Sequence, residues 1–420
     1  MRIFKFGGAS VKDAAGVKNV AKILNEFAGE KVLVVISAMG KCTNKFEDLV
    51  HAYFHGTGQA KNILNEIKDF HYQILKELDH NSSISLYNDV DNLLLELECL
   101  IENPNNLPDF DFVYDQIVCF GELLSTRIVS NYLITCNTRN QWIDARNFII
   151  TNNRYRDGKV DWEKTEHLIA NRLKPLAEKS LVISQGFIGR DSLNATTTLG
   201  REGSDYSAAI FAYCLKAKSV TIWKDVAGVM NADPKKFPFA TLIPTLSYND
   251  SIELAYYGAS VIHPKTMQPL KARNIPLFVK SFLNTGDAGT VVSETSAELN
   301  APCYIHKSNQ VLMELSTRDF TFIVEDTLKE IFTILADHKV QCNIMQNSAI
   351  SFSFVADQAE DRIVKISEIF QQLGLNVLVH SGLELLTVYH GATAQVDQLI
   401  EGKQIKMEQR TGKTVHYVLA

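Results

Sequence analysis

Residues 1–40, MRIFKFGGASVKDAAGVKNVAKILNEFAGEKVLVVISAMG, contain the succession of elements that decides the fold of this chain. A short apolar stretch at 3–6 predicts a strand, and a glycine pair follows it directly. Five apolar side chains then recur with the spacing of one helix face: Val17, Val20, Ala21, Leu24 and Phe27. The run VLVVI at 32–36 is apolar throughout, as in a parallel strand buried on both faces. Strand, helix and strand in this order predict a right-handed βαβ unit of a parallel sheet.

The sequence up to about residue 297 continues as one α/β domain. Helical periodicity at 63–78 and at 90–101 indicates a helical hairpin laid on the sheet. Further strands are expected at 181–183 and 220–223, with a helix at 204–217 between them. At 420 residues the chain is too long for a single compact core, so we expect further domains beyond this one.

The pattern changes after a polar stretch at about 293–300. Short strands and helices alternate from 311 to 380, and the alternation restarts at 384 and ends in a hairpin around Thr411 and Gly412. We therefore expect an α+β regulatory module at 305–383 and a second, shorter one at 384–420.

Composition and charge exclude several classes of protein. The net charge of −6 and the pI near 6.0 provide no electrostatic reason to expect nucleic acid or an anionic membrane as a partner. The N-terminus lacks the apolar core of a signal peptide, and no later stretch is expected to approach the length of a membrane span. The seven cysteines are scattered without a CxxC pair, which is typical of reduced thiols in a cytoplasmic protein and predicts no structural metal site.

Three segments rich in glycine, serine or threonine follow predicted strands or precede a predicted helix. They are KFGGAS at 5–10, SAMGKCTN at 37–44 and TTTLGREGSDY at 196–206. Ligands of open parallel sheets bind at the carboxyl ends of the strands, where helix N-termini offer N–H groups to phosphates. Either of the first two alone is compatible with an ordinary turn. The third is longer than helix capping requires, which favours a binding role.

These segments and three others resemble, in order, the motifs of the aspartate kinases of the amino-acid-kinase family. The matches are KFGG(T/S)S at 5–10, SAxGxTN at 37–44, GE at 121–122, TTTLGRxGSDYSA at 196–208, DVxGVxxADP at 225–234 and ELAYxGAxVxHP at 253–264. The resemblance covers nearly the whole chain. It implies an amino-acid-kinase fold, with a mostly parallel central sheet flanked by helices, followed by ACT-like modules of the ferredoxin type.

The resemblance further implies an enzyme that converts ATP and L-aspartate to ADP and 4-phospho-L-aspartate, the first step of lysine, threonine and methionine biosynthesis. The acceptor would be a carboxylate with a pKa of about 4, so that no general base is needed. Two alternatives remain open. One is a related amino-acid kinase with another acceptor, and the other is a weakened kinase fold that acts as an amino-acid sensor.

By resemblance, the motifs assign roles to particular residues. Lys5 and Asp205 are expected to be catalytic. The aspartate pocket is expected to consist of Ser37, Thr43, Glu122, Phe187, Arg201 and Ser204. ATP is expected to contact Gly7, Gly8, Ser10, Lys224, Asp225, Met230, Lys235 and Ser260. The cofactor Mg²⁺ would be bound through the nucleotide phosphates, without metal ligands from the protein.

The nucleotide side departs from the family pattern at four positions. Lys224 replaces a threonine, Met230 a tyrosine, Lys235 an arginine and Ser260 a lysine. The last change removes an expected phosphate contact, and Lys224 or Lys265 could supply the missing charge. The resemblance also implies a homodimer, because ACT strands often pair across a dimer axis. It leaves the feedback effector open.

Overall fold

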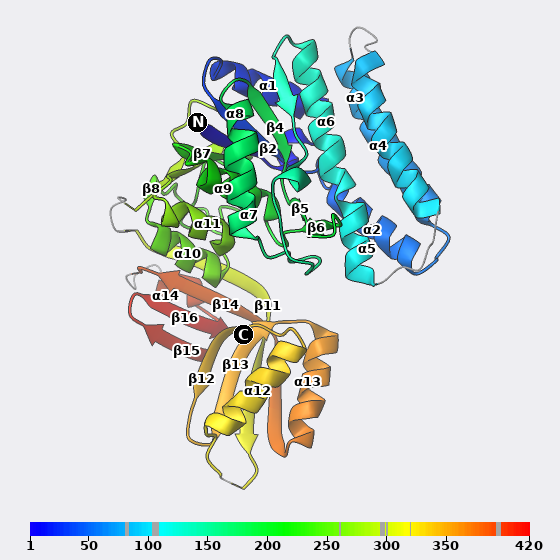
Figure 1. The fold of residues 1–420 in the computed structure, drawn as a ribbon. Coiled ribbons are helices and arrows are strands. Elements are labelled where there is room, and N and C mark those ends of the chain that lie inside the picture. The colour runs from blue at the N-terminus through cyan, green and yellow to red at the C-terminus, as the bar shows by residue number, and fades with distance from the viewer. Residues whose placement is uncertain are drawn as a thin grey trace. The chain divides into compact units, whose positions relative to one another are not determined.

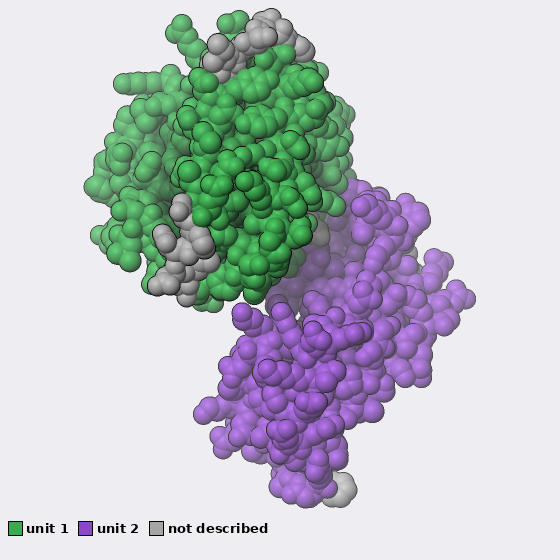
Figure 2. Space-filling view, turned by 90° about the vertical axis from the view of Figure 1, so that its right-hand side faces the viewer, with its two compact units in different colours: residues 1–229, 242–252, 261–298 green, residues 230–241, 253–260, 299–420 purple. Residues whose placement is uncertain are grey.

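The computed structural model describes residues 1–79, 84–102, 109–259, 262–294, 299, 301–319, 321–391 and 396–420, with only the backbone at 84–86. The chain forms two compact units. Unit 1 comprises 1–229, 242–252 and 261–298, and unit 2 comprises 230–241, 253–260 and 299–420 (Figures 1 and 2). The predicted division at 297 takes no account of the two short segments that cluster with unit 2.

Unit 1 is built around an eight-stranded sheet of order β3-β4-β2-β1-β7-β9-β10-β8. Its strands are β1 (Arg2–Phe6), β2 (Val32–Ile36), β3 (Asn140–Trp142), β4 (Leu181–Gln185), β7 (Ser219–Lys224), β8 (Thr245–Leu246), β9 (Leu277–Ser281) and β10 (Thr290–Val292). All neighbouring strands pair in parallel except β9 and β10. A separate antiparallel pair consists of β5 (Ile188–Arg190) and β6 (Thr196–Thr198). The predicted mostly parallel sheet is therefore confirmed.

Helices cover this sheet (Figure 1). They are α1 (Ala14–Glu26), α2 (Cys42–Phe54), α3 (Ala60–Leu78), α4 (Ile84–Glu102), α5 (Phe110–Val118), α6 (Phe120–Thr135), α7 (Trp162–Leu168), α8 (Lys174–Ala177), α9 (Gly203–Leu215), α10 (Tyr248–Tyr257) and α11 (Pro264–Ala272). The described residues also form two short 3₁₀ helices, η1 (Gly8–Val11) and η2 (Ala145–Asn147), and one short π-helix, η3 (Ile169–Leu173). Helix α9 packs on β1, β2 and β7, and α6 packs on β2 and β4. The first turn of α9 meets β1 through the contact of Asp205 with Lys5, and the first turn of α6 meets the segment after β2 through the hydrogen bond of Glu122 with Ala38.

The predicted helical hairpin is formed by α3 and α4, which lie side by side in Figure 1. It packs mainly on other helices rather than directly on the sheet, with α4 against α6 and α3 against α1 and α2. The amphipathic pattern of α3 identifies a helix with one buried face. Such a face can pack on another helix as well as on a sheet, so the pattern does not identify its neighbour.

One stretch of the described chain, Phe110–Thr135, is long and apolar enough to span a membrane by length and composition alone. The expectation that no stretch reaches that length is therefore wrong. The mean hydropathy of its 18-residue window is 1.3, and 78% of that window is buried inside the structure. Such burial is typical of a core helix, because α6 is covered by its neighbours in unit 1.

Unit 2 contains a six-stranded sheet of order β12-β13-β11-β14-β16-β15. The strands are β11 (Cys303–Thr317), β12 (Cys342–Asn347), β13 (Ser351–Asp357), β14 (Leu375–Tyr389), β15 (Ile405–Thr411) and β16 (Thr414–Leu419). Its helices are α12 (Glu325–Asp337), α13 (Glu360–Gln372) and α14 (Val396–Ile400). The strands expected at 377–380 and 384–389 are one strand, β14, because β11 pairs with both halves across a local register shift. The predicted division at 383/384 falls inside this strand.

Three apolar clusters lie among the described residues of unit 2, and two of them attach its helices and the segment 230–241 to the sheet. Helices α12 and α13 pack on one face of the sheet through Ile331, Leu335, Ile366 and Phe370. The segment 230–241 joins the sheet elsewhere, where Ala232 forms a bridge with Tyr304 and Phe237 packs with Tyr304, Leu386 and Val388. This burial explains why a segment from the middle of the kinase motifs clusters with unit 2.

Candidate active site

A cavity of about 510 Å³ lies in unit 1. Nine of the predicted site residues line it: Lys5, Ser37, Thr43, Glu122, Phe187, Arg201, Ser204, Asp205 and Lys224. They come from β1, from the segment after β2, and from the first turns of α2, α6 and α9, together with β7 and the loops after β4 and β6. The structure thus brings together all predicted catalytic and aspartate-pocket residues, although their roles remain predictions.

Lys5 and Asp205 form a buried ion pair at one part of the cavity. The Nζ atom of Lys5 lies 2.7 Å from Oδ1 of Asp205, and the two side chains are 11% and 5% exposed. Burial by itself raises the pKa of Asp205, but the positive charges of Lys5 and Lys224 outweigh burial and hold it below its usual value. Asp205 is therefore an anion that orients Lys5 toward the cavity.

Glu122 has a buried carboxyl group with one oxygen left without a partner. Its Oε1 accepts a hydrogen bond from the N–H of Ala38 at 3.2 Å, whereas Oε2 is buried and has no hydrogen-bond partner. Burial raises the pKa of Glu122 to about 8, although the Ala38 N–H and the charge of Lys5 act in the opposite direction. A buried acceptor of this kind fits a cationic ligand group, which would satisfy the oxygen and restore the charged form.

The loops after β1 and β2 are joined closely at the edge of the site. Gly40 donates its N–H to the carbonyl of Gly8 at 3.0 Å, and Ser37 donates its N–H to the carbonyl of Phe6 at 3.1 Å. A Cβ atom on Gly8 would lie 2.5 Å from the Gly40 oxygen and 2.9 Å from the Ala38 oxygen. Glycine at position 8 is therefore required by the approach of the two loops.

The start of α9 supplies several walls of the cavity. Asp205 lies in the first turn of this helix, where a negative charge is favourable. Phe187 has a φ of +69° and donates its N–H to Ser207 Oγ at 2.9 Å, which keeps its backbone against the helix. A positive φ at a residue with a large side chain is uncommon and often marks a functional site. Arg201 lies just before α9 and is exposed to the cavity.

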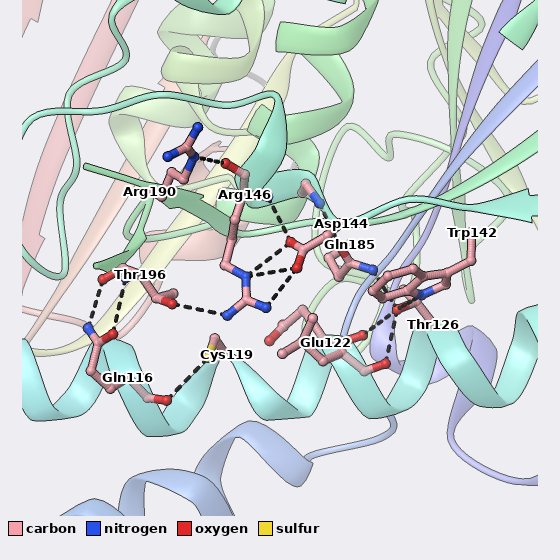
Figure 3. A network of polar contacts seen from close by, with 12 residues as sticks. Gln116, Cys119, Glu122, Thr126, Trp142, Asp144, Arg146, Gln185, Arg190 and Thr196 are labelled. Atoms are coloured by element: carbon pink, nitrogen blue, oxygen red, sulfur yellow. Dashed lines mark hydrogen bonds and ion pairs between the residues drawn. The ribbon is translucent and has the colours of Figure 1, made fainter. Parts of the chain in front are cut away.

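A polar network behind the cavity holds α6 and thereby Glu122 (Figure 3). Thr126 Oγ1 donates to the carbonyl of Glu122 at 2.8 Å and accepts from Gln185 Nε2 at 2.9 Å and Trp142 Nε1 at 3.0 Å. Arg146 forms a two-pronged ion pair with Asp144, which also joins this layer. The network links α6 to β3 and β4, so the position of Glu122 depends on the sheet as well as on its own helix.

The predicted nucleotide-binding residues are less concentrated. Lys224 lines the cavity, and Gly7 is adjacent to Lys5, because a Cβ atom on Gly7 would lie 3.3 Å from Lys5 Nζ. The buried hydroxyl of Ser10 donates to the carbonyl of Trp223 at 3.4 Å, which is a structural contact. Asp225 is exposed.

The remaining three nucleotide predictions concern other parts of the chain. Met230 and Lys235 lie in the segment of unit 2 described above. Ser260 lies outside the described residues. Two lysines were considered as replacements for the family lysine. Lys265 forms an ion pair with Asp157, whereas Lys224 lines the cavity and its charge lowers the pKa of Asp205. Lys224 is therefore the better candidate.

The cavity also contains residues that the sequence did not single out. Tyr114 and Arg156 line it, together with Thr198, Gly200, Glu202 and Gly203 of the third motif, for which no individual role was predicted. Asp115 lies behind them and accepts hydrogen bonds from Arg156 N at 3.0 Å and from Thr198 N and Oγ1 at 2.8 and 2.7 Å. The partners of Asp115 are 41 and 83 residues away in the sequence, so no local pattern could have identified them.

Comparisons with known proteins identify the family to which this chain is similar. Residues 1–281 match the model of the amino acid kinase family. Lysine-sensitive aspartokinase 3 of Escherichia coli is 33% identical over 358 residues, which cover 84% of this chain and 78% of that protein. Aspartokinase 1 of Arabidopsis thaliana is 32% identical over 371 residues, which cover 85% of this chain but only 63% of the relative.

A solved structure extends the likeness to the whole chain. Escherichia coli aspartokinase III, determined in complex with aspartate and ADP, is 28% identical, with a TM-score of 0.81 and coverage of 100% of this chain and 96% of that one. The family model matches more than two thirds of this chain, and the alignment with the bacterial relative covers more than two thirds of that protein. The chain therefore belongs to the amino acid kinase family, and within it to the aspartokinases.

Proposed function

We propose that this protein is an aspartate kinase, which transfers the γ-phosphoryl group of ATP to the side-chain carboxylate of L-aspartate. One observation carries the proposal: a single cavity combines the cations Lys5, Lys224 and Arg201 with the unpartnered buried oxygen of Glu122. An acceptor that carries both carboxylates and an ammonium group matches this set of charges. A nucleoside monophosphate, which has no ammonium group, would leave Glu122 without a partner.

The acceptor would be held at both of its α-substituents. Glu122 would receive the ammonium group at Oε2, and Arg201 would pair with the α-carboxylate, for which a planar two-pronged donor is well suited. Ser37, Thr43, Phe187 and Ser204 would complete the pocket. This arrangement leaves the side-chain carboxylate directed toward Lys5.

The reaction would be an in-line displacement. An oxygen of the ionised acceptor carboxylate attacks the γ-phosphorus, the bond from phosphorus to the bridging oxygen breaks, and ADP leaves with the electron pair. The main obstacle is the approach of two anions, which positive side chains and N–H groups relieve. Lys5, oriented by Asp205, would stabilise the charge on the transferring group, and the N–H groups at the start of α9 would assist it.

Magnesium would enter with the nucleotide. Within the parts of the chain that the structure describes, no group of three or more histidine, cysteine, aspartate or glutamate side chains could hold a metal ion. Asp205, an acid of the cavity, is already paired with Lys5. Following the family resemblance, we propose that Mg²⁺ would be held by the phosphates of ATP and would neutralise part of their charge.

The relatives support the choice of acceptor, because the Escherichia coli structure contains aspartate and ADP.

We also propose a homodimer. Strands β12 and β15 form the two edges of the sheet in unit 2, and such edges can pair with a second copy. Light scattering on the purified protein would test this state. A cytoplasmic location remains a prediction.

An acceptor-dependent ADP-release assay tests the proposed function. We expect ADP release with ATP and L-aspartate, and little release with L-glutamate or with no acceptor. Turnover with another amino acid alone would favour a related kinase. A folded protein that binds amino acids without releasing ADP would favour the sensor alternative.

A further inference from the structure

Arg156 lies on the wall of the cavity but outside every motif of the family resemblance. It belongs to the turn at 154–158, which is exposed except at Gly158 and at the partly buried residues 155 and 157. Its neighbour Arg154 is also exposed, pairs with Asp157 at 3.6 Å and does not line the cavity. Two arginines of one turn therefore differ in whether they face the site.

The backbone of Arg156 is fixed from behind by a buried carboxylate. Its φ is +63°, and its N–H donates to Asp115 Oδ2 at 3.0 Å. The same carboxylate binds the N–H and the hydroxyl of Thr198, another residue of the cavity wall. Asp115 is 0% exposed, so this junction is shielded from water. The left-handed conformation of Arg156 is thus maintained by contacts that also position the third motif.

The side chain of Arg156 lies along an aromatic ring of the cavity. Its guanidinium carbon is 4.3 Å from the centre of the Tyr114 ring, and the Tyr114 hydroxyl donates to Glu47 at 2.7 Å. Arg156 Nη1 also lies 3.1 Å from Asp111 Oδ1, but these two side chains are 45% and 55% exposed. An ion pair that is so open to water contributes little to stability. An anionic ligand in the cavity can therefore displace Asp111 from Arg156.

The positive charges of the cavity fall into two groups. The charges of Lys5 and Lys224 lower the pKa of Asp205. The charge of Arg156 instead opposes the rise in pKa that burial causes in Tyr114 and Asp115. The Arg156 carbonyl lies 3.1 Å from the position that a Cβ of Gly200 would occupy, and Gly200 directly precedes Arg201. Arg156 and Arg201 therefore belong to adjoining segments of the wall, apart from the Lys5–Asp205 pair.

We propose that Arg156 is a second guanidinium of the acceptor pocket, which together with Arg201 holds the α-carboxylate of the amino acid. Asp115 acts as its positioning residue. This inference rests on the proposed function and refines it, because it assigns acceptor specificity to a residue outside the family motifs. Two guanidinium groups would favour an acceptor with a full negative charge at the α-position over one with a neutral amide.

The test compares two matched variants, Arg156→Gln and Arg154→Gln. Glutamine keeps most of the side-chain length and removes the charge, and both substitutions lie in one turn. The KM for L-aspartate and for ATP would be measured for each variant, together with the inhibition constant of the α-amide of aspartate (L-isoasparagine). Thermal unfolding of both variants would establish that they fold like the wild type.

We expect Arg156→Gln to raise the KM for L-aspartate by roughly tenfold or more and to leave the KM for ATP within about twofold. The inhibition constant of the α-amide should change little, because that compound has no charge for Arg156 to hold. Arg154→Gln should resemble the wild type in all three constants. Arg156→Lys should give an intermediate KM for L-aspartate, since it keeps the charge but not the fork.

Three results would overturn the inference while leaving the proposed function intact. They are a wild-type KM for L-aspartate in Arg156→Gln, a rise in the KM for ATP instead, and an equal loss of affinity for aspartate and its α-amide. The last result would indicate a purely structural role for the turn. Absence of aspartate-dependent ADP release by the wild type would overturn the proposed function and, with it, this refinement.

Discussion

Glu122 concentrates the chemistry of the site in one side chain. It is only 3% exposed, one of its oxygens has no partner, and burial raises its pKa to about 8. The ligand-free protein therefore holds it mostly neutral at pH 7, whereas an ammonium group would require the carboxylate. Ligand binding and proton release at this residue should be coupled.

Aspartate binding is expected to release a proton below about pH 8. With a pKa of about 8, roughly 0.9 of a proton would be bound to Glu122 at pH 7 in the ligand-free protein, and most of it should leave when the ammonium group binds. Affinity should rise as the pH increases from 6 to 8. Titration calorimetry in phosphate and in Tris buffers counts the protons. A pH-independent affinity with no proton release would show that Glu122 does not receive the ammonium group.

The same residue should lower the stability of the ligand-free protein near neutral pH. Because its folded pKa is raised, the stability associated with its neutral form is present below about pH 4.5 and is lost as the pH rises through about 8. Glu122→Gln should therefore be more stable than the wild type at pH 8 but not at pH 4.5. Urea unfolding at several pH values measures the difference in the free energy of unfolding between the two proteins. Asp115 also has a raised pKa, but it titrates in both proteins and so does not affect this difference. A constant difference would contradict the assignment.

At the scale of elements, the site depends on how closely the loops after two neighbouring strands approach each other. Strands β1 and β2 pair in register from Arg2 with Val32 to Phe6 with Ile36, so both end at one edge of the sheet. The loops beyond them contact through Gly8 and Gly40. Lys5 projects from the end of β1, and its position is therefore sensitive to any change that separates the two loops.

Gly8→Ala is expected to lower kcat by about tenfold to a hundredfold, because a small displacement of a catalytic group has effects of this size. The added Cβ would meet the carbonyl oxygens of Gly40 and Ala38 at 2.5 and 2.9 Å, so the loops must move apart. Steady-state kinetics with both substrates measure the effect. Gly286→Ala is the matched control, since its Cβ would meet only Asn284 Oδ1 at 3.7 Å in an exposed turn. Equal activity of the two variants would contradict the proposed role of the loop contact.

At the scale of the whole molecule, the order of the chain and the division into units do not coincide. The segment 230–241 follows the strand that carries Lys224, yet it packs within unit 2. Asn231 accepts the N–H of Tyr304 at its carbonyl at 2.7 Å and donates its side-chain amide to the carbonyl of Pro302 at 3.1 Å. Met230 and Lys235, which are predicted to contact the nucleotide, are thus part of unit 2.

Phe237→Ala is expected to reduce the free energy of unfolding by about 3–5 kcal/mol, as for other buried phenylalanines. It should also raise the KM for ATP more than that for L-aspartate, because it loosens the segment that carries Met230 and Lys235. Phe239→Ala, at a side chain that is 36% exposed, should have a smaller effect of about 1 kcal/mol. Urea unfolding and kinetics provide both quantities. An unchanged KM for ATP in Phe237→Ala would argue against a nucleotide role for this segment.

Much of this protein follows from short stretches of sequence. The apolar run at 32–36 is strand β2 residue for residue, and four of the five residues of the helical stripe that starts at Val17 lie on the buried face of α1, whereas Phe27 follows its last residue. Both patterns repeat over a few residues, so they can be read without knowledge of distant parts of the chain. The family resemblance likewise identifies lysine, arginine and carboxylate groups whose chemistry suits phosphoryl transfer, and the structure brings five of them to one cavity: Lys5, Lys224, Arg201, Glu122 and Asp205.

Only the tertiary structure decided which other residues share that cavity and what surrounds them. The contacts of Asp115 with Arg156 and Thr198, the unpartnered oxygen of Glu122, the continuity of β14 and the place of 230–241 in unit 2 all depend on packing between distant segments. Burial and hydrogen-bond satisfaction are properties of the assembled fold, because they are set by neighbours that lie far away along the chain. The residue types could be recognised from the sequence, but their partners, exposure and pKa values could not.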